Sequence, residues 1–156
     1  MDEKYILERM LNLCSRREYC KSDIRRKISR IKVEKSVDAD AIIAKLCEER
    51  FIDEARYCAA FARDKSAIAG WGEKKIVYTL LSRKIPYDII EEAFKEIEQD
   101  KSQKRMIEVL SIKYRSIKAE NEYERKEKLL RYGVSRGYSY EQILSVYDNI
   151  RSDKRD

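Results

Sequence analysis

The chain of 156 residues contains no histidine, and it has only four glycines and one proline. Without histidine it lacks the side chain that most often transfers protons near neutral pH and that commonly binds zinc. Cys14, Cys20, Cys47 and Cys58 form no CxxC pair, so a structural zinc site would need four thiolates from scattered segments. No serine or cysteine stands beside a convincing base, and paired acids adjacent in sequence point to different sides of a helix. We therefore expect no enzyme activity, no metal and no cofactor.

Long apolar runs are also missing. Charged residues occupy positions 2 to 4 and only short apolar stretches follow, so we expect no signal peptide and no membrane span. Cysteines without paired spacing, in a chain with no export signal, are typical of reduced thiols. We expect a cytoplasmic monomer that does not bind membranes.

Composition and periodicity indicate an all-α fold. Charged residues make up 41 % of the chain and hydrophobic residues 43 %, a balance typical of helix-rich soluble proteins. We expect Ser22 or Asp23 to begin the second helix, and Asp38 or Asp40 the third, after a connector at 33–37. Apolar residues three and four positions apart predict helices over 4–14, 24–31, 40–50, 54–68, 73–84, 86–97, 103–115, 123–132 and 140–150.

The predicted helices repeat in groups of three. Sliding the chain by 53 residues aligns Ile76 with Leu129, Leu81 with Val134, Ile85 with Tyr138, Tyr87 with Tyr140, Ile90 with Ile143 and Ile97 with Ile150. A shift of 47 aligns Ile43 with Ile90 more weakly. A period near 50 is typical of solenoid-like arrays, in which each unit packs on the next. We therefore expect three tandem three-helix repeats, at 1–50, 51–99 and 100–151, stacked into an elongated, curved array with a frayed tail at 152–156.

Charge is distributed in blocks. The net charge is +6, but residues 16–35 alone carry nine cations against three acids, and residues 63–84 carry six against two. The compensating acids gather in residues 87–100, which hold six acids and one cation. Such runs are often only solvated helix faces. Their clustering also favours contact with nucleic acid phosphates or with an acidic protein surface.

Two features of the middle repeat allow more than one interpretation. Gly70-Trp71-Gly72 is expected to break the helix, with Trp71 either packed over the break or exposed as a partner contact. It lacks the spacing of a phosphate-binding loop. Asp53 and Glu54 are expected to begin a helix, where the helix dipole favours them, although an acidic contact is the alternative. Most of the tyrosines, including Tyr87, lie at core spacing.

The middle repeat resembles the RecX family of bacterial RecA regulators. The likeness is carried by Phe51-Ile-Asp-Glu54, Arg56-Tyr-Cys58, Phe61-Ala-Arg63, Gly70-Trp-Gly72, Lys75-Ile76, Leu80 and the run from Ile85 through Ile90 to Phe94. Outside it the likeness rests on the pattern of repeated helices. Two residues, Lys65 and Lys84, depart from the family pattern. Lys65 stands where a second arginine is usual. Lys84 stands where glycine is frequent, which makes a left-handed helix end less favourable there.

The resemblance implies a non-enzymatic regulator that binds the filament of RecA on single-stranded DNA and inhibits its ATPase, recombinase and co-protease activities. A directly nucleic-acid-binding helical module, on single or double strands, is the alternative, and a scaffold for an acidic protein is a third. The residues expected to contact the partner or DNA are Arg25, Arg26, Lys27, Arg63, Lys65, Trp71, Lys74, Lys75, Arg83 and Lys84. The family-motif residues expected to be mainly structural are Asp53, Glu54, Tyr57, Phe61, Gly70, Gly72, Ile76 and Leu80.

Overall fold

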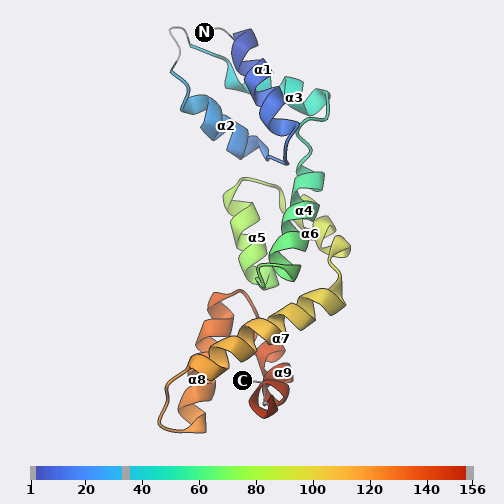
Figure 1. Cartoon of the computed structure of the whole chain (residues 1–156). Helices are drawn as coiled ribbons and strands as arrows, with labels where there is room; N and C mark the ends of the chain where they lie inside the picture. The colour runs from blue at the N-terminus through green and yellow to red at the C-terminus, as the bar shows by residue number, and fades with distance from the viewer. Residues whose placement is uncertain (1–2, 33–35, 154–156) are drawn as a thin grey trace. The chain divides into compact units, whose positions relative to one another are not determined.

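A computed structural model describes residues 3–32 and 36–153, and within these ranges all regular secondary structure is helical (Figure 1). The expected all-α class is thereby confirmed. Residues 33–35 of the expected connector and 154–156 of the expected tail lie outside the described residues. The helices are α1 (Glu3–Cys14), α2 (Lys21–Ser29), α3 (Ala39–Glu48), α4 (Glu54–Ala67), α5 (Glu73–Ser82), α6 (Tyr87–Ala93), the 3-10 helix η1 (Phe94–Glu96), α7 (Gln99–Ser116), α8 (Glu122–Ser135) and α9 (Tyr140–Ser152).

Short polar side chains begin several of these helices. The Asp38 carboxylate accepts a hydrogen bond from the Ala41 amide at 3.1 Å, as expected for a cap of α3. The second helix begins earlier than expected, because Cys20 is the capping residue and α2 starts at Lys21. The side chain of Asp23, three residues on, accepts a hydrogen bond from the Cys20 amide at 3.3 Å. Asp23 therefore closes the first turn from inside the helix rather than preceding it.

Unit 1, one of two compact units, comprises the described residues of 1–61 and 80–95. Helices α1 and α2 pack against α3 there. The apolar stripes expected from the sequence face one another between these helices, and no charged residue among those described is buried. Its buried members are Ile6, Met10, Ile24, Ile28, Ile42, Ile43, Leu46 and Ile52.

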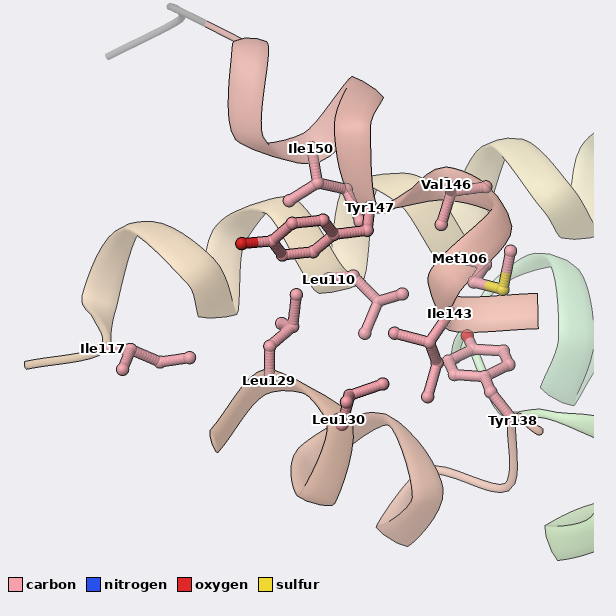
Figure 2. Packing of buried hydrophobic residues seen from close by; sticks show 10 residues of the cluster. All are labelled: Met106, Leu110, Ile117, Leu129, Leu130, Tyr138, Ile143, Val146, Tyr147 and Ile150. Atoms are coloured by element: carbon pink, nitrogen blue, oxygen red, sulfur yellow. The ribbon is translucent and has the colours of Figure 1, made fainter. Parts of the chain in front are cut away.

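Unit 2 comprises residues 62–79 and the described residues of 96–156. Helices α7, α8 and α9 pack against one another, and Figure 2 shows their buried side chains converging on the space between the three helices. The cluster consists of Met106, Leu110, Ile117, Leu129, Leu130, Tyr138, Ile143, Val146, Tyr147 and Ile150. The boundary between the units falls inside α4 and α5, so the expected repeat boundaries and the curved stacking stay predictions.

The 53-residue repeat holds for most core positions and for one pair of helix starts, since α6 and α9 begin at Tyr87 and Tyr140. Tyr87 is 56 % exposed, so its expected place in the core is wrong, and the aligned Tyr140 is 57 % exposed. Leu81 and Val134 are likewise exposed. In α5 Leu80 is buried and its neighbour Leu81 is not, because a step of one residue turns a side chain by about 100° around the helix axis. Some of the residue pairs that the 53-residue shift aligns are therefore surface positions and not core positions.

Left-handed residues end two of the equivalent helices. Lys84, after α5, has φ 62°, and Gly137, after α8, has φ 99°. The Ile85 amide donates to the Leu80 carbonyl and the Tyr138 amide to the Gly133 carbonyl, so the two ends make the same reversal. The left-handed end thus forms at Lys84 although a lysine side chain disfavours it.

Candidate functional site

Trp71 lies between α4 and α5 with two lysine ammonium groups over its ring. The Lys65 Nζ atom is 4.8 Å from the ring centroid and the Lys75 Nζ atom is 4.3 Å from it. Both distances are within the range of cation–π attraction. All three side chains are half-buried, so they remain accessible in part. We call Lys65, Trp71 and Lys75 the tryptophan–lysine cluster.

Two glycines let the chain turn at Trp71. Gly70 has φ 70°, a left-handed conformation that favours glycine. Gly72 instead allows a close approach of two backbones, because a Cβ atom there would lie 2.2 Å from the carbonyl carbon of Gly137. The Gly72 amide donates to the Arg136 carbonyl at 2.7 Å, and the Lys74 amide donates to the Gly137 carbonyl at 3.2 Å. The turn after α8 therefore holds the start of α5, and with it Lys75.

Side chains from α7 and the α8–α9 turn bind the carbonyl groups left free at the end of α4. The Arg105 Nε atom donates to the Ile68 carbonyl at 2.9 Å. The Arg136 guanidinium donates to the carbonyls of Ala69 and Gly70, and the Tyr138 hydroxyl also donates to Gly70. Burial raises the pKa of Tyr138 to about 12, so this hydroxyl keeps its proton as a donor. The last carbonyl groups of a helix have no donor within the helix, so these side chains supply the missing hydrogen bonds.

Sequence reasoning missed this capping set. Arg105, Arg136 and Tyr138 are far from Gly70 in the chain, and nothing local marks them as its partners. The sequence did relate the turn that holds Arg136 and Tyr138 to the turn after α5, since the 53-residue shift places Arg136 opposite Arg83 and Tyr138 opposite Ile85.

Arg83 serves the packing of unit 1. Its guanidinium carbon lies 4.9 Å from the Phe61 ring centroid and 5.9 Å from the Tyr57 ring centroid, and the guanidinium donates to the Tyr57 hydroxyl. The two rings stack with centroids 5.9 Å apart. Burial raises the pKa of Tyr57, which keeps the phenol neutral. These contacts occupy Arg83, and its expected role as a partner contact stays a prediction.

The basic residues of α2 have their own neighbours. Arg25 pairs with Asp40 at 2.6 Å, and Arg26 lies 3.9 Å from Asp23. The Lys27 ammonium lies 5.3 Å from the Tyr19 ring centroid. The expected contact residues are divided between the two units: Arg25, Arg26, Lys27, Arg83 and Lys84 belong to unit 1, whereas Arg63, Lys65, Trp71, Lys74 and Lys75 belong to unit 2.

The other motif residues have structural contacts. Asp53 accepts from the Arg56 amide at 3.0 Å and so begins α4, as expected. Glu54 accepts from the Lys21 amide at 3.3 Å, which joins the starts of α4 and α2. Ile76 and Leu80 are fully buried.

The third repeat supplies an internal comparison for the tryptophan–lysine cluster. The 53-residue shift places Lys75 opposite Lys128 and Trp71 opposite Glu124. Lys128 pairs with Glu124 at 3.0 Å, so a carboxylate neutralises that ammonium group. Within the described part of the chain, no carboxylate pairs with Lys75. An aromatic ring holds an ammonium group without neutralising it, so the middle repeat keeps a positive charge where the third repeat cancels it.

Two family models match the chain. Residues 53–93 match the second three-helix domain of RecX, and residues 100–147 match its third three-helix domain. The chain belongs to the RecX family. The tryptophan–lysine cluster lies inside the match to the second RecX domain, and its capping residues Arg105, Arg136 and Tyr138 lie inside the match to the third.

Curated relatives agree with the family models. Regulatory protein RecX of Clostridium botulinum (strain Eklund 17B / Type B) is 30 % identical over 117 residues, which cover 72 % of this chain and 54 % of the relative. Regulatory protein RecX of Yersinia enterocolitica is 25 % identical over 171 aligned positions, covering 92 % and 96 %. The chain thus spans about half the length of the clostridial relatives and nearly the full length of the Yersinia protein.

Solved RecX structures share the fold. A crystal structure of regulatory protein RecX superposes with a TM-score of 0.82 at 20 % identity, covering 94 % of this chain and 73 % of that one. RecX from Lactobacillus salivarius superposes with a TM-score of 0.76 at 17 % identity, covering 96 % and 97 %. The arrangement of helices is therefore that of RecX.

Proposed function

We propose that this chain is a non-enzymatic regulator that binds the RecA filament on single-stranded DNA and lowers its ATPase, recombinase and co-protease activities. Membership of the RecX family, whose curated relatives are regulatory proteins, supports the choice of RecA as the partner. The observation that carries the proposal onto this chain is the tryptophan–lysine cluster, where the RecX second domain keeps a charge that the third repeat neutralises.

The cluster is suited to a negatively charged partner. An ammonium group over an aromatic ring is partly desolvated and has fewer conformations to lose, so pairing it with a phosphate or carboxylate has a smaller entropic cost. The capping contacts of Arg136 and Tyr138 hold the α4–α5 turn in place. Binding that holds neighbouring filament subunits in one state would slow ATP hydrolysis without any bond being made by the regulator.

The experiment is a titration of RecA ATPase activity on single-stranded DNA with increasing amounts of the chain. The proposal expects hydrolysis to fall at ratios up to one chain per RecA subunit. Heat-denatured chain is the control for nonspecific effects of a basic polypeptide. Unchanged hydrolysis throughout the titration would refute the proposal.

A directly nucleic-acid-binding module is the second candidate. Tyr78 is 76 % exposed and lies one helical turn after Lys74, an exposed cation next to an aromatic ring that could stack on a base. Trp71 is the single tryptophan of the chain, so its fluorescence reports on this region when an oligonucleotide is added. Tight binding to DNA alone, lost steeply as salt is raised, favours this second function over the first.

Whichever partner binds, we propose that the chain acts in the cytoplasm, where recombination filaments form. None of the helices in residues 3–32 and 36–153 is long and apolar enough to cross a membrane.

A further inference from the structure

Unit 1 contains a cavity whose described charged lining residues are all cations. It lies between α1 and the end of α2 and has a volume of about 440 Å³, within the range of pockets that bind ligands or side chains. Four cations line it: Arg9 from α1, Lys27 from α2, and Arg30 and Lys32 just after α2. Among the residues that the structure describes, no acidic side chain contributes to the lining. A ligand there would meet a strong positive potential.

The floor of the cavity is apolar and aliphatic. Met10 is almost fully buried, and Leu13 and Ile31 are half-buried, so their side chains present hydrocarbon to the cavity. None of the described residues that line it is aromatic. Sites that bind single-stranded nucleic acid stack bases on aromatic rings. An aliphatic floor under a ring of cations instead fits an aliphatic side chain flanked by carboxylates.

We infer that this cavity binds an acidic peptide segment of a partner protein, with one aliphatic side chain on the Met10–Leu13–Ile31 floor and its neighbouring carboxylates paired with Arg9 and Arg30. Arginine suits this role because its planar guanidinium binds a carboxylate through two parallel hydrogen bonds. Lys27 is already positioned, since its ammonium group lies over the Tyr19 ring. The inference does not depend on RecA binding, because it concerns a different surface and a binding assay without RecA or DNA.

The experiment measures fluorescence anisotropy of a labelled peptide with one leucine flanked on both sides by glutamates, titrated with the full chain. Replacing the leucine with serine, or the glutamates with glutamine, should weaken binding. The pocket variant is Arg9→Gln with Arg30→Gln. The matched control is Arg115→Gln with Arg131→Gln, which removes two arginines from exposed positions outside the cavity lining. Both pairs are exposed, and thermal unfolding checks that each variant folds.

We expect the pocket variant to bind the glutamate–leucine peptide about tenfold more weakly, because it loses two contacts between arginine and carboxylate. The control should change the affinity by less than about twofold. Leu13→Ser tests the floor and should weaken the same peptide. Absence of peptide binding, or equal losses in the pocket variant and the control, would overturn the inference. So would a labelled oligothymidylate that binds in place of the peptide and loses affinity only in the pocket variant.

Discussion

The Tyr138 hydroxyl donates a hydrogen bond to the carbonyl oxygen of Gly70, 68 residues earlier in the chain. This contact joins the glycine turn before α5 to the turn before α9, and both residues are buried. The candidate site is therefore positioned by residues of the third repeat rather than by the middle repeat alone.

Tyr138→Phe should destabilise the chain by about 1–2 kcal/mol, because the Gly70 carbonyl loses a buried donor. Urea unfolding followed by circular dichroism measures the effect. Tyr140→Phe is the matched control, since that side chain is exposed and at the neighbouring helix start. Equal stability of the two variants would show that the Tyr138 contact contributes nothing.

Lys84→Gly should stabilise the chain by about 1 kcal/mol, because glycine adopts the left-handed conformation at φ 62° without steric cost. Lys84→Ala removes the same charge but keeps a Cβ atom, so it separates backbone strain from electrostatics. We expect no gain from alanine. A glycine variant no more stable than the alanine variant would contradict the account of this helix end.

The helices of this chain could be predicted from the sequence, but the contacts between distant turns could not. Within the described residues, periodicity predicted every α-helix, because each buries an apolar stripe, but it did not separate η1 from α6. The 53-residue shift aligned Tyr87 with Tyr140, the residues at which α6 and α9 begin. Periodicity did not distinguish Leu80 from Leu81, since an apolar residue beside the stripe looks the same as one within it. It also could not find the hydrogen bond from Tyr138 to Gly70, because tertiary contacts between distant turns leave no periodic signal.

Stability should be nearly constant between about pH 6 and 8, because histidine is the side chain that ordinarily titrates there and the chain has none. Above that range it should fall. Burial raises the pKa of the Cys58 thiol from 9.0 to about 12, so unfolded chains lose this proton first as pH rises through 9.0. The folded state then holds more protons, and by linkage stability decreases with rising pH.

Melting temperatures measured from pH 8 to 10 check this direction. Cys58→Ala should flatten the decline, whereas Cys47→Ala, at a half-buried thiol, should flatten it less. Stability that rises over this interval would contradict the buried, protonated thiol.

Lys65→Gln combined with Lys75→Gln should weaken inhibition of RecA ATPase by about tenfold, the effect of losing two charged contacts of roughly 0.7 kcal/mol each. Lys128→Gln is the control, because Lys128 occupies the position equivalent to Lys75 and is neutralised by Glu124. Circular dichroism verifies that the variants keep their helices. Equal inhibition by the double variant and the control would remove the tryptophan–lysine cluster from the interface.

The most direct measurement of the central claim is equilibrium binding of the chain to three targets: preassembled RecA filaments on an oligonucleotide, the bare oligonucleotide and free RecA. A nonhydrolysable ATP analogue keeps the filaments intact during the measurement. The account predicts clearly tighter binding to the filament than to either component. Binding to the bare oligonucleotide as tight as to the filament, or no binding to the filament, would contradict it.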